Sequence, residues 1–182
     1  MFIESPALTR FANQIETAPW FSSLGQTLTL EETDYAKKYI NLIGLEAVKI
    51  SKITSWVEAE NLIKAPDWSE SWWIAEEQTR KSLTSCTEKK YGRESVLESL
   101  TYITSCVSNI VHGAAAISAA QGGMANSGMI RAAAGAATLA SHQAALEILA
   151  NKNTTGPFIS KYRLFESGHW PLCLNSKAFY IF

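Results

Sequence analysis

Two residues near the middle of the chain could form a nucleophile and its base. Cys106 and His142 fall in two predicted helices between residues 100 and 150. If these helices run antiparallel about Met124, Cys106 lies at about the same height as His142. A histidine beside a cysteine is the minimum that a thiolate nucleophile needs. The sequence suggests neither an acid to orient the ring nor a glycine-rich turn for an oxyanion hole. We therefore favour a core or interface histidine and an inert cysteine.

Other histidines offer candidate binding groups. His112 lies on the small, polar side of its predicted helix, with Ser105 and Asn109, which indicates an exposed or interfacial ring. Glu166 and His169 fall within one turn near the C-terminus. The candidate binding residues are His112, His142, Glu166, His169 and Trp170.

Metal chemistry is weakly supported. The carboxylates that a two-metal helical site could use are Glu46, Glu76, Glu77 and Glu147. Such sites need Glu-x-x-His on two helices, but Asn109 stands three residues before His112, and Leu139 before His142. His169 and Cys173 are spaced like helical ligands, yet Pro171 between them opposes a helix, and two ligands are too few for structural zinc. We predict no metal and no other cofactor.

Three tryptophans close together could form an aromatic box. Trp68, Trp72 and Trp73 would suit a cation or a flat ligand. Aromatic residues at helical spacing more often belong to a core, and the sequence favours that interpretation.

A helical hairpin over residues 100–150 must position most of these groups. Between His112 and Glu147 the only permanently charged side chain is Arg131, and small residues dominate. Small side chains let two helices approach closely. The first arm is expected to bury an apolar face that includes Leu97 and Ile117, and to end at Gly122 and Gly123. The second arm is expected to bury a stripe of Ala132, Gly135, Leu139, His142, Leu146 and Leu149, so Gly135→Leu should overfill the seam.

Four capping boxes predict where other helices begin. They are Thr29/Glu32, Ser55/Glu58, Asp67/Glu70 and Ser95/Glu98. A helix follows the first box, residues 51–54 form a joint, and a short helix ends before Pro66. A helix over about 68–90 should carry the surface pairs Glu76–Arg80 and Glu77–Lys81.

These elements predict an all-α fold in one domain, 1–182. Residues 1–28 are expected to be irregular, with a short helical turn near 6–14. Residues 29–151 form an antiparallel four-helix bundle with one short extra helix. Residues 152–182 form a tail of extended segments packed on the bundle, and a small β-hairpin turning at residues 175–177 would fit the tail.

Composition excludes some classes of function. The 182 residues are 47% hydrophobic and 18% charged, with a formal net charge of -1. Such a chain lacks the basic excess that nucleic acid binding rewards. Three separated cysteines argue against a disulfide framework. We expect no secretory signal, no membrane span and a cytoplasmic location.

Two functions remain open from the sequence. The first is a non-catalytic binding protein, either a self-associating subunit or an accessory to a protein partner, because surface charge is low and no convincing catalytic set exists. The alternative is a small enzyme or a ligand or metal carrier. Its pocket would lie between the 100–150 hairpin and the C-terminal tail.

Overall fold

The computed structural model describes residues 3–46, 49–65, 67–150 and 155–182. The fold is mostly helical, at 69%, and a small three-stranded mixed sheet completes it. The elements in chain order are α1 (Pro6–Thr17), α2 (Leu30–Leu42), β1 (Lys49–Lys52), α3 (Trp56–Lys64), α4 (Glu70–Tyr91), α5 (Arg93–Gln121), α6 (Ser127–Ala150), α7 (Pro157–Glu166), β2 (Pro171–Leu174) and β3 (Ala178–Ile181).

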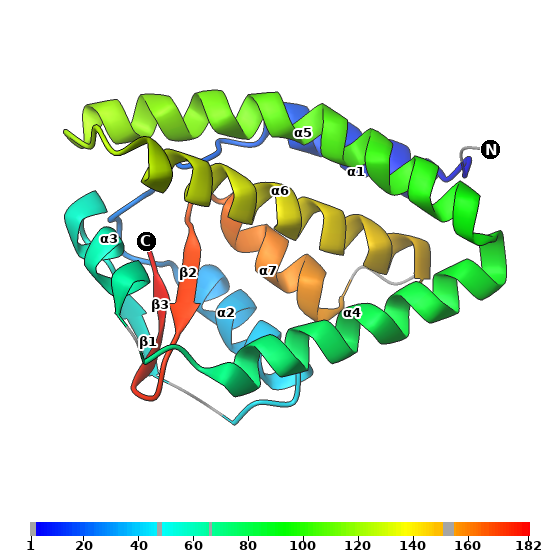
Figure 1. Ribbon diagram of the computed structural model, residues 1–182, viewed down its shortest axis with the longest axis horizontal. Coiled ribbons are helices and arrows are strands. Elements are labelled where there is room, and N and C mark those ends of the chain that lie inside the picture. The colour runs from blue at the N-terminus through cyan, green and yellow to red at the C-terminus, as the bar shows by residue number, and fades with distance from the viewer. Residues whose placement is uncertain (1–2, 47–48, 66, 151–154) are drawn as a thin grey trace.

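The central helix is α6, which contacts α1, α4, α5 and α7. Helices α4 and α5 diverge from Gly92, whose positive φ of 82° suits glycine, and α6 and α7 lie between them (Figure 1). The predicted antiparallel four-helix bundle is not confirmed, because α2 packs mainly on α7 instead of completing a bundle. The C-terminal residues bring so much aromatic and aliphatic surface that they occupy the core beside α6.

The prediction of extended structure in the C-terminal tail was wrong for the first half of the tail. Pro157–Glu166 is the helix α7, and Pro157 occupies a first-turn position where its missing N–H costs nothing. The residue before it, Gly156, provides no side-chain cap. Instead the buried carboxylate of Glu147 on α6 accepts a 2.8 Å hydrogen bond from the Ile159 N–H. A Cβ on Gly156 would lie 1.6 Å from Glu147 Oε1, so only glycine leaves room for this long-range cap.

The β-hairpin in the tail is confirmed. Strands β2 and β3 pair antiparallel, and the Asn175 carboxamide oxygen accepts from the N–H groups of Lys177 and Ala178 at 2.9 and 3.0 Å. Strand β1 adds in parallel to β3, with Ile50 opposite Phe179. The sequence interpretation took residues 51–54 as a joint and missed β1, because a four-residue strand gains its stability from its partner.

Two of the four predicted helix starts are confirmed. Thr29 and Glu32 cap α2 reciprocally, and Ser55 accepts from Glu58 N–H at 3.2 Å. The start at Asp67 was wrong, because Ser69 caps α4. The start at Ser95 was also wrong: α5 begins at Arg93 without a side-chain cap. Residues 6–17 form α1, a longer helix than the turn expected there.

Helices α5 and α6 form the predicted hairpin, but different faces meet. The buried face of α6 includes Ala133, Ala137, Ala140 and Ala144. Gly135 is exposed and a Cβ there would have no heavy atom within 4 Å, so the expected seam at Gly135 was wrong. On α5, Leu97 and Ile117 are each 63% exposed, contrary to the predicted face.

The length and composition of α5 also meet the criteria for a membrane-spanning helix. Within the part of the chain that the structure describes, α5 is one helix that is long enough and apolar enough to cross a membrane, judged by length and composition alone. Of its most apolar 18-residue window, 28% is buried inside the protein. The exposed residues of α5 are mostly polar, and Leu97, Tyr102 and Ile117 are its exposed large hydrophobic residues.

Candidate functional site

A cavity of about 260 Å³ opens between α6, the tryptophans at and just before the start of α4, and the C-terminal tail. We call it the tryptophan pocket. It is lined by Ile63, Trp68, Trp72, Trp73, Glu76, Ala132, Gly135, Ala136, Leu139, Lys161, Trp170, Pro171 and Leu172. Most of these side chains are apolar, and the two charged ones come from α4 and α7. A concave apolar site with few polar groups is the usual form of a small-ligand site.

Three tryptophan rings form one side of this pocket. The rings of Trp68 and Trp73 are stacked, with centroids 6.3 Å apart and an interplanar angle of 8°. The ring of Trp72 lies 5.5 Å from that of Trp73. Trp72 is buried, whereas Trp73 is 50% exposed. The sequence interpretation of all three as core residues therefore fits Trp72 and does not fit Trp73.

A buried charge pair forms the polar part of the pocket. Lys161 Nζ lies 2.6 Å from Glu76 Oε1, and the two side chains are 8% and 6% exposed. The Tyr39 hydroxyl also donates to Glu76 Oε1 and accepts a 2.6 Å hydrogen bond from Trp72 Nε1. Burial and then the neighbouring Glu76 raise the pKa of Tyr39 well above its usual value. A buried ion pair needs such additional hydrogen bonds, because the free-energy cost of desolvating the two charges otherwise exceeds their mutual attraction.

The Lys161 ammonium is also held by aromatic rings. It lies 5.5 Å from the centre of the Tyr39 ring and 5.6 Å from that of Trp72. Such contacts attract a cation to the faces of the rings. The pair is therefore oriented by α2, α4 and α7 together, which fixes the position of its charges.

A second concavity of about 550 Å³ lies between α5 and α6. We call it the histidine groove. Its lining is Thr104, Ser108, Asn109, His112, Arg131, Ala134, Gly135, Thr138, Leu139 and His142, a set that contains hydroxyls, an amide and bases but no carboxylate. The spacing of residues 104, 108 and 112 places them on one side of α5, next to the seam with α6.

The histidines of the groove differ in burial. His112 is exposed, and His142 is half-buried with Nδ1 3.4 Å from Thr104 Oγ1. Burial and then the nearby Arg80 guanidinium lower the pKa of His142. The neutral ring is therefore the favoured form of His142 near pH 7.

The structure brings His112 and His142 together but separates them from Cys106. Thr104 is the α5 side chain that contacts His142, while Cys106 makes a side-chain hydrogen bond with Tyr102. Cys106 is also outside the lining of the groove. The geometry therefore supplies no thiolate and base pair.

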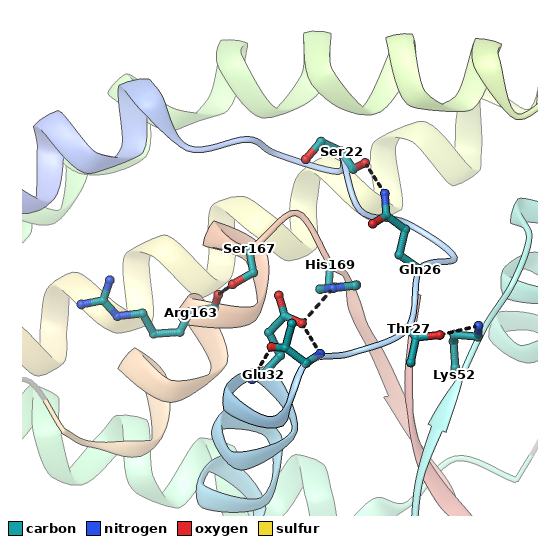
Figure 2. Close-up of polar contacts among 9 residues, drawn as sticks. Ser22, Gln26, Thr27, Glu32, Lys52, Arg163, Ser167 and His169 are labelled. Atoms are coloured by element: carbon teal, nitrogen blue, oxygen red, sulfur yellow. Dashed lines mark hydrogen bonds and ion pairs between the residues drawn. The ribbon is translucent and has the colours of Figure 1, made fainter.

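The C-terminal candidates lie in a different part of the molecule. His169 is buried, and its Nε2 lies 3.5 Å from Glu32 Oε2 at the start of α2 (Figure 2). Burial lowers the pKa of His169, and the Glu32 carboxylate partly offsets this. Glu166 pairs with Arg163 within α7. Of the tail candidates, Trp170 lines the tryptophan pocket.

Sequence reasoning missed the roles of Glu76 and Lys161. Glu76 was expected to pair with Arg80 on the surface, which was wrong, because Arg80 Nη2 lies 2.7 Å from Glu77 Oε1. The predicted Glu77–Lys81 pair is present at 3.5 Å. The available signal was the position of Glu76 four residues after Trp72, on the apolar side of α4.

Metal ligands do not gather in the described ranges. No group of three or more His, Cys, Asp or Glu side chains there could hold a metal ion. The two concavities are lined by apolar surface, aromatic rings and a few charged groups.

Comparison with known proteins gives no relative. No family model, no curated protein and no solved structure matches the chain.

Proposed function

We propose that this protein binds a small aromatic molecule in the tryptophan pocket. The observation that carries the proposal is an apolar cavity whose lining includes a buried, fully oriented Glu76–Lys161 pair. Buried charges cost free energy, and replacement by apolar residues is often neutral or stabilising. Their presence beside a cavity is therefore better explained by ligand recognition than by stability.

The size and lining of the pocket define the kind of ligand. Drug-sized ligands occupy roughly 300–1,000 Å³, so about 260 Å³ suits a molecule of one or two rings. The tryptophan rings offer π-faces for offset or edge contact with a planar ring. This proposal corresponds to a carrier or sensor with its site between the hairpin and the C-terminal tail.

Calorimetric titration with indole tests the proposal directly. Indole should bind the full-length protein, and Ala136→Phe should weaken binding at least tenfold, because the new ring fills the pocket. The matched control is Ala116→Phe on α5, a half-buried alanine outside both cavities. A failure of indole to bind, together with the absence of any ligand adduct in native mass spectrometry, would reject the proposal.

A second candidate function is self-association through the outer side of α5. Tyr102 and Ile117 are exposed there, at 47% and 63%, and Ile110 between them is half-buried. These positions lie on one side of the helix, since they are spaced by eight and seven residues. An uncovered apolar stripe is typical of a surface that packs against a second copy.

Light scattering coupled to size-exclusion chromatography tests this second candidate. The protein should show a concentration-dependent dimer that Ile117→Lys converts to a monomer. Val57→Lys on α3 is the matched control, because Val57 is exposed to a similar degree, at 61%, on another helix. A wild-type monomer at all concentrations would exclude self-association.

A further inference from the structure

The tryptophan pocket and the histidine groove meet over one turn of α6. Gly135 and Leu139 line both concavities. Gly135 has no side chain, and the space above it is open to at least 4 Å from an ideal Cβ position. A ligand seated among the tryptophans can therefore extend across the backbone of α6 into the groove. This inference rests on the proposed function.

The two compartments differ in charge. In the tryptophan pocket, the negative charge of Glu76 is balanced by Lys161 at 2.6 Å, and the remaining lining is apolar. A charged ligand group placed there would have no free counter-charge and would lose its hydration. The part of the ligand inside the pocket is therefore uncharged.

The histidine groove has an unbalanced positive charge. The exposed Arg131 lines it, and no ion pair joins Arg131 to a carboxylate among residues that the structure describes. His112 and His142 add ring nitrogens, and Ser108 and Asn109 add a hydroxyl and an amide that can donate. The hydroxyls of Thr104 and Thr138 donate to the Leu100 and Ala134 carbonyls at 2.9 and 2.8 Å. Arginine binds carboxylates and other planar anions through paired N–H groups. The groove therefore complements an anion.

We propose that the ligand is an aromatic acid, with its ring in the tryptophan pocket and its anionic group in the histidine groove near Arg131. The connecting chain is short and passes over Gly135. The absence of a Cβ at this position, rather than tight helix packing, is the role that the geometry assigns to the glycine.

Three compounds that share one carbon skeleton test the inference. They are 3-phenylpropanoate, 3-phenylpropanol and 3-phenylpropylamine, which at pH 7.5 carry a negative charge, no charge and a positive charge. In calorimetric titrations of the full-length protein, the acid should bind at least tenfold more tightly than the alcohol, and the amine most weakly. Equal affinities, or a preference for the amine, would overturn the inference and leave the proposed function intact.

Arg131→Gln locates the anionic group. The variant should bind the acid no more tightly than the alcohol, while its affinity for the alcohol stays as in the wild type. If the variant keeps the preference for the acid, the assignment to the groove is wrong. If neither the alcohol nor the acid binds while indole does, the two-compartment ligand is rejected; if indole also fails, the proposed function falls with it.

Gly135→Val tests the connection between the compartments. The branched side chain should remove the advantage of the acid over the alcohol, because it occupies the space above α6. Gly113→Val on α5 is the matched control, since Gly113 is also helical, exposed and without a neighbour within 4 Å of its Cβ position. An unchanged preference in Gly135→Val would contradict the proposed path.

Discussion

The two sides of α6 are both rich in small residues, but one side is buried in the core and the other lines the concavities. One side carries Ala137 and Ala140, both fully buried in the core. The other side carries Ala132, Gly135 and Ala136, which line one or both concavities. Small residues bring neighbouring helices close on the first side, whereas on the second side they leave space. A pattern of small residues therefore sets how closely a neighbour can approach a helix, and it does not determine whether a neighbour packs there.

The largest effect is expected on the buried side. Ala137→Leu should lower the free energy of unfolding by about 3 kcal/mol, because the added methylene and methyl groups have no space in a close-packed core. The exposed alanine Ala132 offers the matched control, and Ala132→Leu should change stability by less than about 0.5 kcal/mol. Urea denaturation measures both. Similar losses in the two variants would remove the distinction between the sides.

The next effect concerns the carboxylate on the buried side. Glu147→Ala should cost about 1–2 kcal/mol, because the first turn of α7 loses the acceptor for the Ile159 N–H. Glu147→Gln keeps an acceptor oxygen and should cost less. Hydrogen exchange at the amides of residues 158–160 should speed up more in Glu147→Ala than elsewhere in α7. Uniform exchange would argue against a cap supplied from α6.

A smaller effect, of opposite sign, is expected at Gly135. Gly135→Ala should raise the free energy of unfolding by about 0.5–1 kcal/mol, because alanine favours the helix and a Cβ there contacts nothing within 4 Å. Thermal unfolding monitored by circular dichroism gives the sign. A destabilised Gly135→Ala would show that this side of α6 is packed after all.

The smallest effect is a pH dependence on the exposed side. The folded protein lowers the pKa of His142, chiefly through burial, so folding favours the neutral ring. This contribution to stability is present above pH about 6.5 and is lost as the pH falls through the lowered pKa. His142→Gln should therefore lose less stability than the wild type between pH 7.5 and pH 5. Ser108→Ala removes a side chain of the same groove that does not titrate, so this control should follow the wild type.

Much of the helical architecture could be predicted from local sequence. Thr29 with Glu32 marks the start of α2 because a capping box depends on residues three apart, and Gly123 ends the first arm of the hairpin with a φ of 70°. The β-turn at Asn175 is also local, since one side chain satisfies the backbone two and three residues later. Such features need no knowledge of distant residues.

Less of the candidate site could be predicted from the sequence. His112, His142 and Trp170 were singled out and lie in the two concavities, whereas Glu166 and His169 lie elsewhere. The polar centre of the tryptophan pocket was missed because Glu76 and Lys161 are 85 residues apart. A lysine and a glutamate on helices are normally surface residues, and nothing in their local pattern predicts that they meet in the core.

Most of the helices, several of their ends and the small-residue character of α6 follow from local sequence, because hydrogen bonds and steric limits within a few residues set these features. The helix α7 is the exception, since its residues were expected to be extended. The tertiary structure decided which side of α6 is covered, which charges are paired and where space remains. These outcomes depend on α7 packing in the core beside α6, and that packing is a competition among distant apolar surfaces. The two concavities lie where the surface of α6 is not covered by another part of the chain.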